Sequence, residues 1–178
     1  MRASPSKSTN RSRDIMGRCP RSADRRDLMG RLRIVTDITA AADVCFDLSR
    51  SIDLHLESMA ASGERAVAGV TSGLISAGEH VTWEARHLGR RWTVTSRIID
   101  FDRPRRFVDQ MDAGGPFRRF RHEHRFEPTD TGTRVTDVVD FRTRAGPFTP
   151  LADLAAGAYL KRLVTLRNAT IRSRAEAR

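Results

Sequence analysis

Cysteine, lysine and long apolar runs are scarce in this chain of 178 residues. Its two cysteines, Cys19 and Cys45, have no metal-type spacing, so we expect neither a structural disulfide nor a cysteine metal site. No run approaches the roughly 18 apolar residues that a membrane-spanning helix needs, and no apolar stretch typical of a signal peptide follows the N-terminal charges. These absences predict a cytoplasmic protein without a transmembrane segment.

Basic charge is abundant and unevenly distributed. The formal net charge is +10, and residues 1–28 account for +5 of it, with eight basic and three acidic side chains. The same segment offers only Ile15, Met16 and Leu28 as sizeable apolar groups, too few to offset the cost of ordering a backbone, about 1 to 2 kcal/mol per residue. We therefore expect a disordered basic tail over 1–28 and one domain over 29–178.

Two interpretations of this tail stay open. A basic arm can bind nucleic acid or an anionic membrane surface, because neutralising phosphates releases counterions. Alternatively, Met16 and Met29 are in-frame methionines, so residues 1–28 can be upstream sequence translated from a misassigned start.

The domain begins with a strand and two short helices. Residues 32–38 alternate in hydropathy and predict a strand, and Thr39 offers an N-cap for a short helix over 40–48. A second short helix is expected over 51–59. Between residues 66 and 144, turn signals recur every 10 to 15 residues, which suits consecutive antiparallel hairpins and leaves no room for helical crossovers.

One long helix is predicted over 151–174, with an apolar stripe that should pack on the sheet. The stripe consists of Tyr159, Leu160, Leu163, Val164, Leu166 and Ile171. The predicted fold class is therefore α+β: a curved antiparallel sheet of six to seven strands wrapped around a long C-terminal helix, with two short helices after the first strand.

Hairpin register predicts which side chains face the interior. A tight turn within 88–91 puts four pairs on one face, namely His87–Trp92, Ala85–Val94, Trp83–Ser96 and Val81–Ile98. A hairpin centred on Asp130 and Thr131 gives Phe126–Val135, His124–Asp137, His122–Val139 and Phe120–Phe141. The opposite face carries Arg119, Arg121, Glu123 and Arg125, which is typical of a solvated surface.

The order of elements, together with four local segments, resembles the SRPBCC superfamily, also called the helix-grip fold. The segments are ERAVAGVTSGLISAGEHVTWEARHLG at 64–89, FRHEH at 120–124, VTDVVDF at 135–141 and YLKRLVTLRN at 159–168. This superfamily includes START lipid-transfer domains, polyketide cyclases and dehydrases, and pollen-allergen-like proteins, and the chain looks most like its bacterial cyclase/dehydrase-like branch. The resemblance implies a cavity between sheet and helix that accepts an apolar or aromatic small molecule.

The residues expected to line this cavity are those on the apolar face and one from the helix. They are Trp83, His87, Trp92, Phe120, His122, His124, Asp137, Phe141 and Tyr159. His124 beside Asp137 could form an oriented general base, or a polar pair that only tunes the cavity or joins two strands. His124 and Asp137 are therefore the candidate catalytic residues.

A metal centre and other cofactors are not predicted. His122 and His124 point the same way, as in His-x-His metal pairs, but a third ligand would have to be Asp137 or His87, and nothing else has ligand spacing. The Gly114–Gly115 pair before a proline indicates a turn and not a phosphate-binding loop.

Three functions follow as hypotheses. The first is a carrier or sensor of a hydrophobic, lipid- or polyketide-like molecule, and the second is a polyketide cyclase, aromatase or dehydrase using His124 and Asp137. The third is an RNA- or ribosome-interacting protein, although the interleaved acids Glu123, Asp109 and Asp112 favour a solvated sheet face over a nucleic-acid interface. A monomer and a homodimer are both compatible with the sequence.

Overall fold

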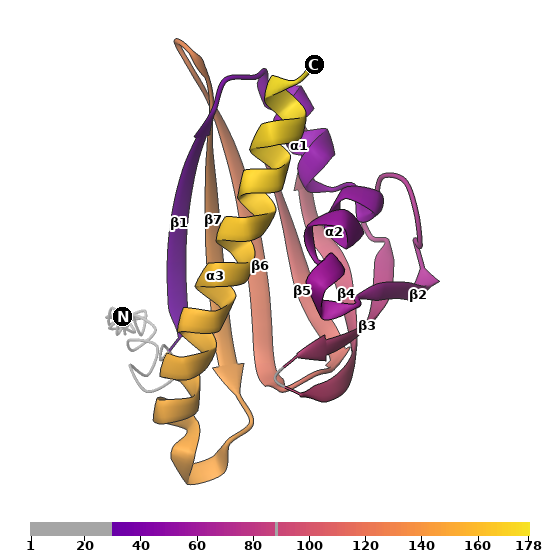
Figure 1. The fold of residues 1–178 in the computed structure, drawn as a ribbon, viewed down its shortest axis with the longest axis vertical. Helices are drawn as coiled ribbons and strands as arrows, with labels where there is room; N and C mark the ends of the chain where they lie inside the picture. The colour runs from indigo at the N-terminus through magenta and orange to yellow at the C-terminus, as the bar shows by residue number, and fades with distance from the viewer. Residues whose placement is uncertain (1–29, 88) are drawn as a thin grey trace, which may run out of the picture.

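The computed structural model describes residues 30–178, apart from Leu88 and the side chain of His87 (Figure 1). The predicted tail over 1–28 lies outside the described residues. Along the chain the elements are β1 (Arg31–Ile38), α1 (Ala42–Ser49), α2 (Ile52–Ser58), η2 (Ala60–Ser62), β2 (Arg65–Gly69), β3 (His80–His87), β4 (Arg90–Asp102), β5 (Arg106–Gly114), β6 (Phe117–Thr129), β7 (Gly132–Thr143), η3 (Gly146–Phe148) and α3 (Thr149–Glu176).

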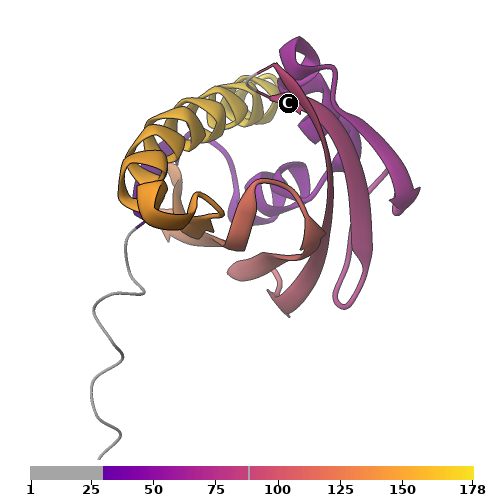
Figure 2. The ribbon, with the colours of Figure 1, turned by 90° about the horizontal axis from the view of Figure 1, so that it is seen from below.

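The strands form one antiparallel sheet in the order β1-β7-β6-β5-β4-β3-β2. Neighbours in sequence pair as hairpins from β2 to β7, and β1 joins the far edge beside β7. The long helix α3 contacts β1, β7 and both short helices. Seen from below, the sheet is strongly curved and α3 lies across its open side (Figure 2). The predicted α+β helix-grip architecture is confirmed.

The β6–β7 register agrees with the prediction, and the β3–β4 register differs from it. His124 pairs with Asp137 and Phe120 with Phe141. In the other hairpin His87 pairs with Arg90, which makes the turn two residues shorter than expected, with Gly89 in the left-handed region at φ 77°. Because the shift is two residues, the described side chains of β3 and β4 keep their predicted faces.

The prediction that Thr39 caps α1 is wrong. The N-cap is Ala41, whose backbone is extended and which has no side chain to bond the helix end. The backbone N–H of Thr39 instead donates to Glu176 Oε1 at 3.0 Å, near the end of α3. The helix therefore begins two residues later than expected, after a bend at residues 39–40 in which the carbonyl oxygen of Ala40 accepts a hydrogen bond from Thr133 Oγ1 of β7 at 2.7 Å.

The buried side of α3 follows most of the predicted stripe. Leu160, Val164 and Ile171 are buried, at spacings of four and seven residues. Leu166 is 48% exposed and does not belong to the stripe. It lies two residues beyond Val164, and a step of two along an α-helix turns the side chain to the opposite side.

Aromatic side chains hold α1 against the sheet. Phe46 of α1 is fully buried, and its ring meets those of Phe101, Phe107 and Phe126 edge-on at centroid distances of 5.2 to 5.3 Å. This cluster fixes one end of the interior, while a second cluster between β1, β7 and the middle of α3 fixes the other.

Phe46→Ala should destabilise the domain strongly. The change removes a fully buried ring and its three edge contacts, so we expect a loss of about 3 to 5 kcal/mol in the free energy of unfolding. Urea denaturation followed by circular dichroism measures it. The control is Leu166→Ala, at an exposed position of α3, which should cost less than about 1 kcal/mol. Equal losses for the two variants would contradict the packing described.

Candidate functional site

A cavity of about 700 Å³ lies between the concave face of the sheet and α3. This volume falls within the usual range of small-molecule pockets, about 300 to 1,000 Å³. The helix leaves room because it presents small side chains, Ala152, Ala155 and Ala156, toward the space. Members of both core clusters line the walls, so the interior is packed at each end and open in the middle.

Aromatic side chains supply much of the cavity wall. They come from four strands, β3 to β6, and from α3, namely Trp83, Trp92, Phe107, Phe117, Phe120 and Tyr159. Trp83 stacks on the ring of His55 at 4.4 Å, and the Arg90 guanidinium lies 5.1 Å from the centre of the Trp92 ring. Burial raises the pKa of Tyr159, which keeps its phenol neutral. Flat rings fixed in this way offer stacking surfaces to a planar ligand.

One wall of the cavity is polar. His122 of β6 and Asp109 of β5 both line it, and the two residues face each other in register on neighbouring strands. The alternation of β5 puts Phe107, Asp109 and Met111 on the interior side. The prediction that Asp109 belongs to a solvated face is therefore wrong, because that assignment depended on charge alone and not on register.

Behind this wall lies a buried network centred on Asp137, which is inaccessible to solvent. Asp137 Oδ1 lies 2.8 Å from His122 Nε2 and 2.8 Å from His124 Nδ1. Its other oxygen accepts a hydrogen bond from Asn168 of α3 at 2.7 Å, and Asn168 also donates to Thr36 of β1 at 3.1 Å. One carboxylate thus joins β1, β6, β7 and the helix.

The network continues from His124 to Asp109. His124 Nε2 lies 3.2 Å from Asp109 Oδ2, so this imidazole bridges two carboxylates. His122 Nδ1 lies 3.9 Å from the same oxygen, too far for a hydrogen bond. The two histidine rings pack against each other with centroids 3.9 Å apart.

These contacts divide the two histidines electrostatically. Burial and the neighbouring His124 lower the pKa of His122. Burial also opposes the charge on His124, but hydrogen bonds to Asp109 and Asp137 outweigh it and raise its pKa. Burial disfavours ionised Asp137 as well, yet bonds from His122 and His124 hold its pKa well below the ordinary value. His122 is therefore the neutral ring, with Nε2–H donated to Asp137 and a lone pair on Nδ1.

The structure brings five of the nine predicted lining residues to the cavity: Trp83, Trp92, Phe120, His122 and Tyr159. His124 and Asp137 lie behind the wall, and the buried Phe141 packs beside Gly157 of α3, in the cluster between β1, β7 and that helix. The side chain of His87 lies outside the described residues. Contact of any of these nine with a ligand stays a prediction.

Three polar residues of the site were missed from the sequence. Asp109 could have been found by extending the inside–outside alternation from Phe107 through β5. Asn168 and Arg167 stand on α3 between the apolar positions, and Arg167 lines the cavity and donates to the backbone oxygen of Ser49. No local pattern marks them, because their partners are distant in sequence.

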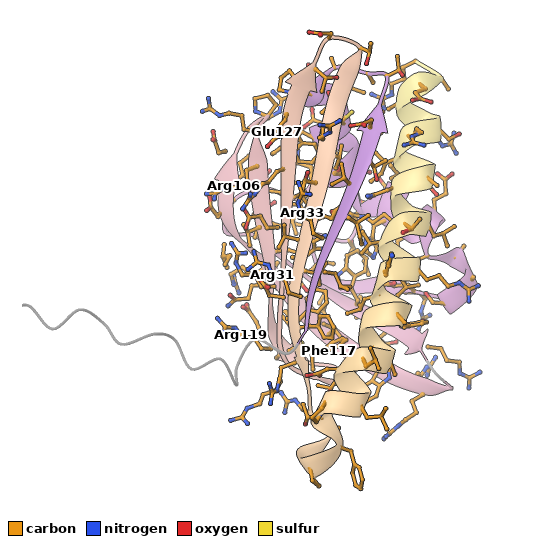
Figure 3. All side chains as sticks on the ribbon, turned by 90° about the vertical axis from the view of Figure 1, so that its left-hand side faces the viewer. Arg31, Arg33, Arg106, Phe117, Arg119 and Glu127 are labelled. Carbon is orange, nitrogen blue, oxygen red and sulfur yellow. The ribbon has the colours of Figure 1, made fainter. Side chains whose placement is uncertain are left out.

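The outer face of the sheet carries the arginine run and its acidic partners. Figure 3 shows Arg106 and Arg119 on this side, turned away from α3. Glu123 accepts hydrogen bonds from Arg121 at 2.9 Å and Arg125 at 2.7 Å. Burial opposes its ionisation, but these bonds lower the pKa of Glu123 to about 2. Several of the arginines are thus paired on the sheet itself.

A curved antiparallel sheet closed by a C-terminal helix over an apolar cavity defines a helix-grip domain. The chain belongs to the polyketide cyclase/dehydrase and lipid transport family, whose sequence profile matches residues 29–176. This confirms the resemblance to the SRPBCC superfamily. None of the helices in the described part, residues 30–87 and 89–178, is long and apolar enough to cross a membrane.

Solved structures share this fold at low sequence identity. The Zhui aromatase/cyclase from Streptomyces sp. R1128 is 18% identical with a TM-score of 0.65, covering 82% of this chain and 93% of its own. A START superfamily protein from Mycobacterium smegmatis is 13% identical with a TM-score of 0.63, covering 83% and 97%. The major latex-like protein 151 from Panax ginseng is 16% identical with a TM-score of 0.61, covering 82% and 97%. Among curated protein sequences no match is found.

Asp137→Asn should destabilise the domain by about 3 to 5 kcal/mol, since it leaves the buried histidines without the carboxylate that accepts from both. Urea unfolding at neutral pH measures the change. The matched control is Asp140→Asn on the same strand, whose carboxylate lies 3.6 Å from Arg31, outside the Asp137 network. That pair should contribute less than about 1 kcal/mol. If Asp137→Asn lowered the free energy of unfolding as little as Asp140→Asn, the network would add no stability.

Proposed function

We propose that the protein binds a planar, largely apolar small molecule, lipid- or polyketide-like, in the cavity and acts as its carrier or sensor. The observation that carries this proposal is the cavity of about 700 Å³ walled by aromatic side chains. Family and fold support small-molecule binding or a cyclase-like role in general.

The distribution of polar groups indicates the chemistry of the ligand. Most of the wall is apolar, while His122, Asp109 and Arg167 offer hydrogen-bonding groups on one side. A pure hydrocarbon would leave these groups without new partners at a desolvation cost. The arrangement therefore favours an aromatic or acyl body that carries a few carbonyl or hydroxyl oxygens at one edge.

Binding can be followed by the protein's own fluorescence, because Trp83 and Trp92 are its two tryptophans and both line the cavity. We expect 1,8-dihydroxyanthraquinone or oleate to quench this fluorescence saturably and to raise the melting temperature. Binding of 1,8-dihydroxyanthraquinone should be tighter, since it adds planar rings and edge oxygens. If neither probe quenches or stabilises, the proposal fails.

Ala156→Phe should weaken probe binding at least tenfold, because its ring would occupy the cavity from α3. Ala158→Phe is the matched control, since Ala158 lies two residues further on the same helix and is exposed. It should bind the probe like the parent. Melting curves of both variants verify that they fold, and equal affinities would place the ligand elsewhere.

A cyclase- or dehydrase-like activity is a second candidate, favoured by one observation. His122 lines the cavity with a neutral ring, and Asp137 orients this ring through Nε2 at 2.8 Å. Its Nδ1 can therefore accept a proton from a ligand carbon next to a carbonyl group. In this version His122 takes the role first given to His124, and His124 with Asp137 positions it.

With a poly-β-ketone thioester analogue as substrate, His122→Gln should lower kcat by at least about 100-fold, the usual contribution of a general base. The Kd for 1,8-dihydroxyanthraquinone, measured in parallel, separates a loss of ligand binding from the loss of the base. Product analysis by mass spectrometry measures turnover. An unchanged kcat in this variant would remove His122 as the base.

The remaining functional predictions gain no support from the fold. An RNA- or ribosome-interacting role stays a prediction from the charge of the sequence, as do the cytoplasmic location and the choice between monomer and homodimer.

A further inference from the structure

We infer that Asp109, His122 and His124 form a binding centre for a divalent transition metal ion in the polar wall of the cavity. The inference goes beyond the proposed ligand binding and does not depend on it. Among the described residues, one cluster has the composition of a metal site, two imidazoles and a carboxylate, and the inference starts from it.

The ligand atoms converge. One atom from each residue lies within 4.8 Å of the other two. Asp109 Oδ2 lies 3.2 Å from His124 Nε2 and 3.9 Å from His122 Nδ1. Ligands bound to zinc at about 2.0 to 2.2 Å lie roughly 3 to 3.5 Å apart. Small rotations of the side chains therefore suffice to place all three around one ion.

The buried network orients both histidines toward that point. Asp137 Oδ1 binds Nε2 of His122 and Nδ1 of His124, each at 2.8 Å. These bonds use one nitrogen of each ring and leave the nitrogen on the Asp109 side for the ion. A carboxylate behind a histidine ligand is the usual second shell of metal sites, and here one carboxylate serves two ligands while Asn168 holds it from α3.

Charge balance supports the same conclusion. Asp109 and Asp137 contribute two negative charges, and neutral imidazoles add none, so a divalent cation neutralises the group. The ion would take the place of the proton between His124 Nε2 and Asp109 Oδ2. Occupancy of the centre excludes use of His122 Nδ1 as a base, because both need the same lone pair.

The centre opens toward the cavity. Asp109 and His122 line that space, whereas His124 is only 1% exposed. Three protein ligands and an open side match the composition of catalytic zinc sites and of two-histidine, one-carboxylate iron sites. A water molecule or an oxygen of a cavity ligand would complete the coordination. Nitrogen ligands favour zinc, iron or cobalt over calcium or magnesium.

The test uses the full chain with the single change Cys19→Ser, which removes the cysteine outside the described residues as an accidental metal ligand. After dialysis against a chelator, zinc chloride is titrated by calorimetry and cobalt chloride by visible absorption, without any organic probe. We expect one ion per chain with a Kd below about 1 μM, and cobalt d–d bands of a nitrogen–oxygen site.

Asp109→Asn should lower the affinity for zinc at least tenfold, because a neutral amide replaces the anionic carboxylate ligand. Asp112→Asn on the same strand is the matched control, since Asp112 pairs with Arg97 on the outer face at 2.8 Å, and it should bind like the parent. Asp137→Asn, where it folds, should weaken binding 10- to 100-fold through the histidines.

Sub-stoichiometric zinc, or equal affinity in the Asp109→Asn and Asp112→Asn variants, would overturn the inference and leave a purely hydrogen-bonded network. Probe quenching measured in chelator tests ligand binding separately. The failure of either proposal can thus be seen without the other.

Discussion

The buried carboxylate of Asp137 imposes the constraint on which the rest of the interior depends. A charge with no solvent access is tolerated only when donors surround it, and Asp137 has them from β6 and from α3. These donors fix the position of the helix over the sheet and the orientation of both histidines. A shift of β6 against β7 by one residue would remove His124 from Asp137 and turn it to the outer face.

The cavity exists because α3 carries large side chains along one part of its length and small ones along another. Leu160 and Val164 fill the space against β1 and β7, while Ala152, Ala155 and Ala156 do not fill the space above the central strands. At the other end, Phe46 and its ring partners pack α1 against the sheet, and Phe107 of this group also lines the cavity. Protein interiors ordinarily close-pack, so a cavity of about 700 Å³ between two packed clusters is the feature on which the proposed ligand binding rests.

The polar wall joins two kinds of chemistry that the fold alone does not choose between. The lone pair on His122 Nδ1 can accept a proton from a ligand or coordinate a metal ion, and in both cases Asp137 sets the ring orientation. Structural relatives below 20% identity share the scaffold and say nothing about this choice. Which chemistry His122 performs depends on side chains of this chain, chiefly Asp109 beside its ring and Asn168, which holds Asp137.

Local patterns in the sequence determined the strands, the long helix and the side chains that face inward, because alternation along a strand and spacing along a helix are properties of the covalent chain. They gave the pairing of His124 with Asp137 and the faces of Trp83 and Trp92. Tertiary structure alone decided that Asp109 meets His124 and that Asn168 holds Asp137. Those contacts depend on how separate strands and α3 pack together and on which polar group reaches a buried charge. Because the partners are far apart in sequence, no local pattern predicts these contacts.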